Sequence, residues 1–257
     1  MMKNNILIKS TYNENIAVEI YEPTVCKETI VFCHGITGCR KGRTNADDYF
    51  QKLAAKLLKL DYRVILFDFS GHGDREGNDY DVTLSKSTEE LKCILERITK
   101  PSEPISFLVF SYGAAVLANY FEKINNIKVN KIVMYSPCLF PLESCFLNKD
   151  SLFCKDIVKA HEDGSLLEQG YAIVGAKNFR FSSKMIDECK TLSLKALLQN
   201  KDNILCLSGT DDVILDTKLN DEFFRKNNIK NIYLKASHSL FEDIEKAFEY
   251  TIEYLLK

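Results

Sequence analysis

Short apolar runs of strand length alternate with longer stretches of helical periodicity along most of the 257-residue chain, and this alternation restricts the possible folds most. Between the runs "ETIVFCHG", "YRVILFDF" and "NKIVMYSP", apolar residues recur every three or four positions, as at Leu91, Ile94, Leu95 and Ile98. Strands that alternate with helices form parallel sheets covered by helices on both faces. We therefore predict an α/β fold with a mostly parallel central sheet, preceded by a hairpin over residues 5–21.

The alternation lapses between residues 138 and 182, which is too long a stretch for a plain loop in a compact domain. We expect this stretch to be a small cap inserted into a core formed by residues 1–137 and 183–257. After it, the pattern resumes with a helix expected over 184–198 and with the strands "NILCLSG" and "KNIYLKA". The aromatic residues of the stretch are expected either to line a substrate pocket or to pack the cap on the core. They are Phe140, Phe146, Phe153, Tyr171, Phe179 and Phe181.

The composition argues against several classes of partner. A formal net charge of -2 and an apolar content of 46% are those of an ordinary soluble globular protein. Such a charge gives no reason to expect nucleic acid or a membrane surface as a partner. The short basic cluster Arg40, Lys41 and Arg43 is expected to be a solvated loop. No apolar run has the length of a signal or membrane-spanning segment.

The cysteines favour a reducing compartment. Their number, nine, is odd, and the chain contains neither a C-x-x-C pair nor a Cys/His spacing typical of zinc sites. Several of them, such as Cys33 and Cys206, stand within apolar runs, where thiols pack as small hydrophobic groups. We expect a cytoplasmic protein with reduced thiols, with no metal or cofactor, and the sequence leaves its oligomeric state open.

One serine stands at the abrupt end of a predicted strand. Residues 105–109 form a short apolar block, Ser111-Tyr112-Gly113 follows, and helical spacing begins at Ala114. A strand-to-helix turn exposes the hydroxyl at the carboxyl end of the sheet, where ligands bind in open α/β folds. Ser111 is therefore a candidate nucleophile.

A serine nucleophile needs a base to accept its proton and an acid to orient that base. Of the four histidines, His238 has the most suitable place, directly after the last predicted strand. The preceding strand is followed by Asp211 and Asp212, either of which is a candidate for the acid. The resulting chain order of Ser, Asp and His is that of a known class of hydrolases. The sequence thus predicts a nucleophilic triad.

Acyl transfer also requires donors for the negative charge that develops on the former carbonyl oxygen. The stretch "CHGITG" ends a predicted strand and places the N–H group of Ile36 at the same edge of the sheet. The second donor is expected to be the N–H group of Tyr112, the residue after the nucleophile. These two groups form the predicted oxyanion hole.

Four motifs together resemble the α/β-hydrolase superfamily, over nearly the whole chain except the insertion. They are "HGITG" at 34–38, "FDFSGHGD" at 67–74, "GTDD" at 209–212 and "SHSLF" at 237–241. Within the superfamily they look most like small intracellular feruloyl (cinnamoyl) esterases and related carboxylesterases. The resemblance implies an α/β-hydrolase fold, a small-molecule ester as substrate, and Ser111, His238 and Asp212 as nucleophile, base and orienting acid. It also implies a structural role for Asp68, Gly71 and His72.

Two residues depart from the family pattern. Val109 stands where the elbow G-x-S-x-G has its first glycine, and Phe110 replaces a frequent histidine. A β-branched residue there is expected to crowd a strained turn, although Gly113 and Ala114 remain small. Two alternatives therefore stay open beside the serine esterase. One is a thioesterase or acyl-peptidase with the same triad, and the other is a degenerate, non-catalytic hydrolase fold that binds a ligand.

Overall fold

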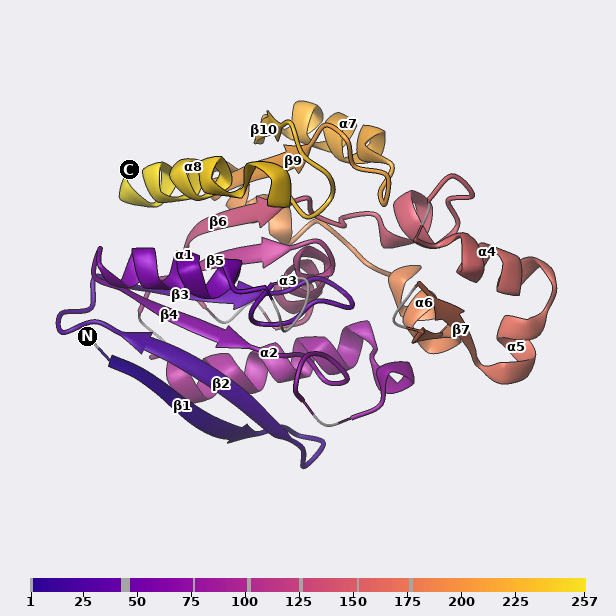
Figure 1. The fold of residues 1–257 in the computed structure, drawn as a ribbon, viewed down its shortest axis with the longest axis horizontal. Helices are drawn as coiled ribbons and strands as arrows, with labels where there is room; N and C mark the ends of the chain where they lie inside the picture. The colour runs from indigo at the N-terminus through magenta and orange to yellow at the C-terminus, as the bar shows by residue number, and fades with distance from the viewer. Residues whose placement is uncertain are drawn as a thin grey trace.

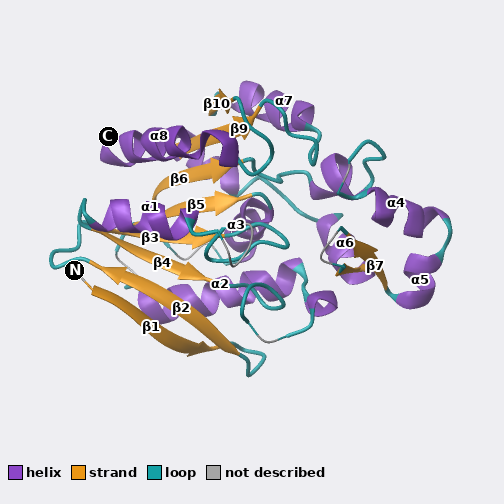
Figure 2. Cartoon of the chain, viewed as in Figure 1, coloured by secondary structure: helices purple, strands orange, loops and turns teal. Residues whose placement is uncertain are grey.

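The computed structural model describes residues 2–42, 47–75, 77–100, 103–124, 127–151, 153–175 and 178–257. Its centre is an eight-stranded sheet, drawn in Figures 1 and 2. In spatial order the strands are β1 (Met2–Lys9), β2 (Asn15–Glu22), β4 (Tyr62–Phe67), β3 (Glu28–Cys33), β5 (Ile105–Phe110), β6 (Val129–Tyr135), β9 (Ile204–Gly209) and β10 (Lys230–Leu234).

The pairing of the strands confirms the predicted mostly parallel sheet. The pairs from β4 through β10 are all parallel. Only β2 runs against its neighbours, because β1 and β2 form the predicted antiparallel hairpin and β2 pairs antiparallel with β4. The carboxyl ends of the parallel strands therefore meet at one edge of the sheet, where candidate site residues follow β3, β5, β9 and β10.

Helices cover both faces of the sheet, as the alternation predicts. One hydrophobic cluster joins one face to α1 (Tyr49–Leu58) and α8 (Ile244–Leu256). A second cluster joins the other face to α2 (Leu84–Ile98), α3 (Tyr112–Lys123) and α7 (Thr217–Asn227). Within β5, Phe107 and Val109 belong to the second cluster and Leu108 and Phe110 to the first. The strand is therefore buried on both faces, which explains its mostly apolar sequence, and the hydroxyl of its buried Ser106 donates to Glu28.

Residues 138–182 form short elements beyond the carboxyl ends of the strands, at the right of Figure 1. These are the π-helical turn η2 (Leu142–Phe146), α4 (Lys155–Glu162), α5 (Ser165–Gln169) and a small antiparallel sheet of β7 (Tyr171–Val174) and β8 (Phe179–Ser182). We refer to residues 138–182 as the inserted segment. Within the described residues, no helix of the protein combines the length and the apolar character needed to cross a bilayer.

The single helix predicted over residues 184–198 is wrong. Helix α6 (Ser183–Cys189) ends early, and a separate 3-10 helix, η3 (Leu197–Asn203), follows it. Between them the Thr191 hydroxyl donates to the Glu188 carbonyl, and the Ser193 hydroxyl donates to the Glu122 carboxylate and accepts from the Lys195 N–H. Such side-chain bonds to nearby groups compete with helical hydrogen bonds. The apolar periodicity continues across this break, so periodicity alone could not reveal it.

Candidate active site

Ser111 lies in a sharp turn between β5 and α3. Its φ of 49° and ψ of -113° lie in a region that residues with side chains seldom occupy. Two backbone hydrogen bonds hold this turn: the Ser111 N–H donates to the Tyr135 carbonyl, and the Cys138 N–H donates to the Ser111 carbonyl, both at 3.0 Å. The neighbouring strand β6 and the residues after it thus stabilise the strained conformation.

The turn forms with Val109 in the place of the first glycine. Val109 is fully buried in β5, with Cys33 of β3 and Met134 of β6 as its register partners. A very close approach of the elbow to the sheet lies at Gly113, where a Cβ atom would stand 2.4 Å from the Cys33 carbonyl oxygen. The elbow therefore depends on the small Gly113 on the helix side of Ser111 and accommodates the β-branched Val109 on the strand side.

The structure brings Ser111, His238 and Asp212 into one chain of hydrogen bonds. The His238 Nε2 atom lies 2.9 Å from Ser111 Oγ, and Nδ1 lies 2.7 Å from Asp212 Oδ2. The other Asp212 oxygen accepts from the N–H groups of Ile214 (2.9 Å) and Leu215 (3.2 Å). The Asp212 side chain is 2% exposed and that of His238 is 14% exposed. This geometry fits a ring that carries its proton on Nδ1 and accepts the serine proton at Nε2.

The two candidate acids have different surroundings. The Asp211 carboxylate faces Lys235 at 2.7 Å and the Thr210 hydroxyl at 3.1 Å, and its side chain is half exposed. Hydrogen bonds from these two groups lower the pKa of Asp211 further than its slight burial raises it. Only Asp212 contacts His238, so the structure places Asp211 outside the hydrogen-bonded chain.

The two predicted oxyanion donors line the same cavity as Ser111. Tyr112 is the first residue of α3, and the first N–H groups of a helix have no partner within it and favour nearby negative charge. Within the described residues, no backbone carbonyl accepts from the Ile36 N–H. Gly35 allows the loop of Ile36 to approach the elbow, because a Cβ atom there would stand 3.1 Å from Ser111 Cβ.

A buried ion pair anchors this loop, and the expectation of a solvated basic loop is wrong for Arg40. The Arg40 side chain is only 12% exposed. Its guanidinium pairs with Asp68 and Glu19, and its N–H donates to Asp68 Oδ1 at 2.6 Å. Lys41 is partly exposed, and Arg43 lies outside the described residues. The acidic partners come from distant strands, so no local pattern predicts this anchor.

The other histidines lie apart from Ser111. The buried His34 accepts the Phe69 N–H at Nε2, and its ring centroid lies 5.0 Å from that of His72. His72 also contacts Phe179 of the inserted segment, at 5.2 Å between ring centroids. His161 lies on α4. In the described part of the chain, no group of three or more His, Cys, Asp or Glu side chains is placed to hold a metal ion.

Phe110 is a site residue whose contact the sequence did not predict. Its ring centroid lies 5.3 Å from that of His238, and it is 6% exposed. A Cβ atom at Gly35 would meet the Phe110 ring at 2.9 Å. The ring therefore fills the space between the loop of Gly35 and the His238 imidazole.

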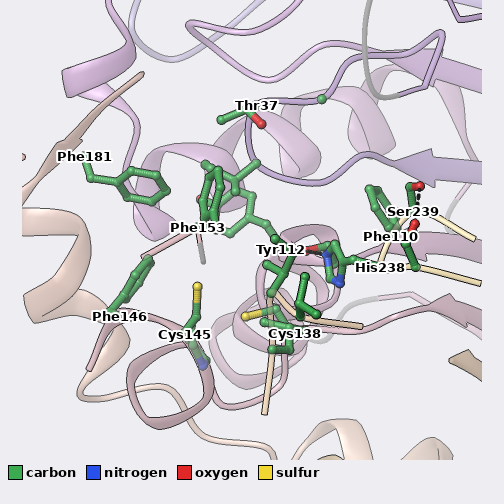
Figure 3. A pocket seen from close by; sticks show the side chains of 18 residues that line it. Thr37, Phe110, Tyr112, Cys138, Cys145, Phe146, Phe153, Phe181, His238 and Ser239 are labelled. Atoms are coloured by element: carbon green, nitrogen blue, oxygen red, sulfur yellow. Dashed lines mark hydrogen bonds between the residues drawn. The ribbon is translucent and has the colours of Figure 1, made fainter. Parts of the chain in front are cut away.

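A cavity of about 570 Å³ opens beside Ser111 and His238 (Figure 3). This volume is within the range of small-molecule sites, about 300 to 1,000 Å³. Its lining comes from the loops after β3, β5, β9 and β10 and from the inserted segment, which contributes Phe146, Phe153 and Phe181. Three other aromatic residues of the segment pack against the core: Phe140 on Phe223, Phe179 on His72, and Tyr171 on Tyr80. The aromatic residues of the segment are therefore divided between the cavity wall and contacts with the core.

Comparison with known proteins identifies the family to which the chain belongs. The family model of the alpha/beta hydrolase fold matches residues 28–156, which are 129 of the 257 residues and thus half of the chain. The chain belongs to this family. No curated protein sequence matches this alpha/beta hydrolase.

Solved structures resemble the hydrolase over its whole length. A presumed hydrolase from Agrobacterium vitis S4 superposes with a TM-score of 0.75 at 17% identity, covering 98% of each chain. An esterase from Exiguobacterium antarcticum has a TM-score of 0.70 at 17% identity, covering 99% of this chain and 100% of its own. The esterase Pf2001 of Pyrococcus furiosus has a TM-score of 0.63 at 19% identity, covering 99% and 92%. At these identities the likeness establishes the fold.

Proposed function

We propose that this alpha/beta hydrolase is a serine esterase that cleaves carboxylic esters through an acyl-enzyme on Ser111. The observation that carries the proposal is the hydrogen-bonded chain of Ser111, His238 and Asp212 beside an apolar cavity. The esterases of Exiguobacterium antarcticum and Pyrococcus furiosus share the fold, which supports an ester as the substrate. Small acyl and aryl esters, including those of the feruloyl or cinnamoyl type, are the proposed substrates.

In the acylation step, Ser111 Oγ attacks the ester carbonyl carbon while His238 Nε2 takes the serine proton. The Asp212 carboxylate, fixed by two backbone N–H groups, stabilises the imidazolium that forms. The Ile36 and Tyr112 N–H groups bind the oxyanion, and each such donor is worth about 3 kcal/mol of barrier. His238 then donates the proton to the leaving alcohol oxygen, which breaks the ester bond.

In the deacylation step, a water molecule takes the place of the alcohol. His238 Nε2 accepts a proton from this water, whose oxygen attacks the acyl carbon, and the same oxyanion donors stabilise the second tetrahedral intermediate. Its collapse returns the proton to Ser111 Oγ and releases the carboxylic acid. A thioester or an activated amide would follow the same steps, so a substrate panel separates these alternatives.

A fluorophosphonate probe tests the nucleophile. We expect labelling of Ser111 in the native protein, no labelling of Ser111→Ala, and a loss of ester turnover of roughly four to six orders of magnitude in that variant. Ser136 stands at the same place after the neighbouring strand β6 and offers the matched control, Ser136→Ala. Equal labelling of wild type and Ser111→Ala, or no labelling of an active wild type, contradicts the assignment. A protein that neither reacts with the probe nor cleaves any ester, thioester or peptide is the non-catalytic alternative.

We also propose that the protein acts in a reducing compartment such as the cytoplasm. All nine cysteines are free thiols, and seven of them are buried. Stable disulfides are typical of oxidising compartments. A disulfide found by mass spectrometry after alkylation of the native protein, isolated without reductant, contradicts this proposal.

A further inference from the structure

The hydrogen-bonded chain determines how a bound ester lies in the cavity. The leaving oxygen must face His238 Nε2, which protonates it, and the carbonyl oxygen must face the Ile36 and Tyr112 N–H groups. The acyl group then occupies the remaining direction, away from His238. In Figure 3, His238 and Ser239 lie on one side of Tyr112, and Cys145 and Phe146 lie on the other. The end of the cavity formed by the inserted segment is therefore the acyl end.

The walls of the acyl end are aromatic. Phe146, Phe153 and Phe181 line it, and their rings fix one another. The Phe181 centroid lies 5.3 Å from that of Phe146 and 6.0 Å from that of Phe153, both with edge-to-face geometry. Such contacts favour a rigid wall that presents hydrocarbon to the acyl group.

Two thiols complete this end, and they are neutral. Cys138 and Cys145 both line the cavity. Burial raises the pKa of the Cys138 thiol well above its ordinary value. A hydrogen bond to the Cys154 thiol, together with burial, raises the pKa of Cys145 in the same direction. Thiols are weak hydrogen-bonding groups, and that of Cys145 already has a partner.

Strong hydrogen-bonding side chains of the lining stand elsewhere. Ser237 and Ser239 adjoin His238 in the chain, and Thr37 lies on the loop of Ile36, above Phe153 in Figure 3. Among the described lining residues there is no Lys, Arg, Asp, Glu, Asn or Gln. A hydroxyl or a charge at the far end of an acyl group would therefore lose its water without gaining a strong side-chain partner.

We propose that the acyl group of the substrate is uncharged and apolar at its distal end, as in an unsubstituted cinnamoyl ester, and that Cys145 discriminates against a ring hydroxyl there. The proposal rests on the proposed esterase activity. Among the proposed aryl esters it ranks those without a ring hydroxyl, such as cinnamoyl esters, above the hydroxylated feruloyl esters.

The test compares three methyl esters that differ only at the distal carbon of the ring. These are methyl cinnamate, methyl 4-hydroxycinnamate and methyl 4-carboxycinnamate. We expect kcat/KM to fall by roughly tenfold or more with the hydroxyl, and further with the carboxylate, because each buries an unsatisfied polar group. Equal kcat/KM for the first two esters overturns this inference. Hydrolysis of 4-nitrophenyl acetate by the wild type reports the esterase activity separately, so its absence overturns both proposals.

A single-atom change at Cys145 tests the discriminating residue. Cys145→Ser replaces the thiol by a stronger hydrogen-bonding group of similar shape. We expect it to raise the ratio of kcat/KM for the hydroxylated ester to that for methyl cinnamate by roughly fivefold. Cys26→Ser changes an exposed thiol between β2 and β3 and should leave the ratio unchanged. An unchanged ratio in a folded Cys145→Ser variant removes Cys145 from the acyl end.

Discussion

The edge of the sheet that carries the proposed triad differs from the inserted segment in the kind of structure that positions its side chains. At the edge, Ser111, Asp212 and His238 each follow a strand, and backbone hydrogen bonds hold both the elbow and the acid. The inserted segment consists of short helices and a two-stranded sheet, and both side-chain contacts and a few backbone hydrogen bonds, such as that from the Asp216 N–H to the Ser144 carbonyl, attach it to the core. One such contact, which we call the latch, joins Asp79 of the 3-10 turn η1 (Asp79–Asp81) to Arg180 of β8.

The side chains proposed for the chemical step and those proposed to select the ester therefore lie in different parts of the molecule. The carboxyl ends of parallel strands lie at one edge of the sheet. Residues far apart in sequence therefore meet there at positions set by the sheet, whatever segment covers that edge. The inserted segment supplies the aromatic walls of the proposed acyl end, and its first residue, Cys138, bonds to the Ser111 turn. Substitutions at the edge should therefore change turnover on every ester, and substitutions in the segment should change the preference among esters.

Apart from loss of the nucleophile itself, the largest effect is expected at the orienting acid. Asp212→Asn should lower kcat by about 10⁴-fold on all esters, because the asparagine favours the wrong tautomer of His238 and no longer stabilises the imidazolium. Asp211→Asn is the matched control and should stay near wild type, since Asp211 contacts Lys235 rather than His238. Steady-state kinetics on 4-nitrophenyl acetate measures both variants. A larger loss of kcat in Asp211→Asn than in Asp212→Asn would mean that Asp211 is the orienting acid.

Substitution of Val109 in the elbow should lower the free energy of unfolding. Val109→Gly empties a fully buried position in β5 and adds backbone freedom in the unfolded chain. We expect the free energy of unfolding to fall by about 2–4 kcal/mol and turnover to fall with it. Val25→Gly, at a site that is 71% exposed, should cost much less. Higher turnover in Val109→Gly would show that the valine crowds the elbow, and would contradict the accommodation that the structure indicates.

A smaller effect is expected at the latch. The Asp79 carboxylate accepts from the Arg180 N–H at 2.8 Å and from Nε at 2.7 Å, and the guanidinium lies 4.8 Å from the centroid of the Tyr80 ring. Arg180→Ala should lower the free energy of unfolding slightly. It should raise KM for methyl cinnamate while leaving 4-nitrophenyl acetate hydrolysis close to wild type. Lys190→Ala removes an exposed ion pair with Asp187 at the end of α6, outside the inserted segment, and serves as control. Equal changes in the hydrolysis kinetics of both esters would mean that the latch also holds the triad in place.

The smallest effect is the pH dependence of the latch. Burial raises the pKa of Asp79, but the hydrogen bonds and charge of Arg180 outweigh it and lower that pKa below the ordinary value of 3.8. A lowered folded-state pKa contributes stability above the unfolded value, and this contribution is lost as the pH falls through the folded value. The stability difference between wild type and Arg180→Ala should therefore be full at pH 7 and smaller near pH 3. Denaturant unfolding at the two pH values measures it, and a difference independent of pH argues against a charged latch.

Much of the core could be predicted because its signals are local. The strand β5 is apolar at every position except Ser106, since both of its faces are buried, and Ser111 follows it at an abrupt change of pattern. The break between α6 and η3 could not be predicted, because Ser193 depends on Glu122 of a distant helix. The same holds for Arg40, whose partners Glu19 and Asp68 are brought to it only by the sheet. From sequence alone, a charged residue is expected to be solvent-exposed unless its partner in the fold is known.

The sequence by itself determined the alternation of strands and helices, and with it the edge at which Ser111, Asp212 and His238 were expected to meet. Apolar periodicity and turn residues act over a few positions, so they are readable without a fold. Only the tertiary structure decided between Asp211 and Asp212 on physical grounds, since the choice depends on which carboxylate reaches the imidazole. It also decided which aromatic residues of the inserted segment line the cavity, because that segment has no periodicity and its side chains take their directions from contacts with the core.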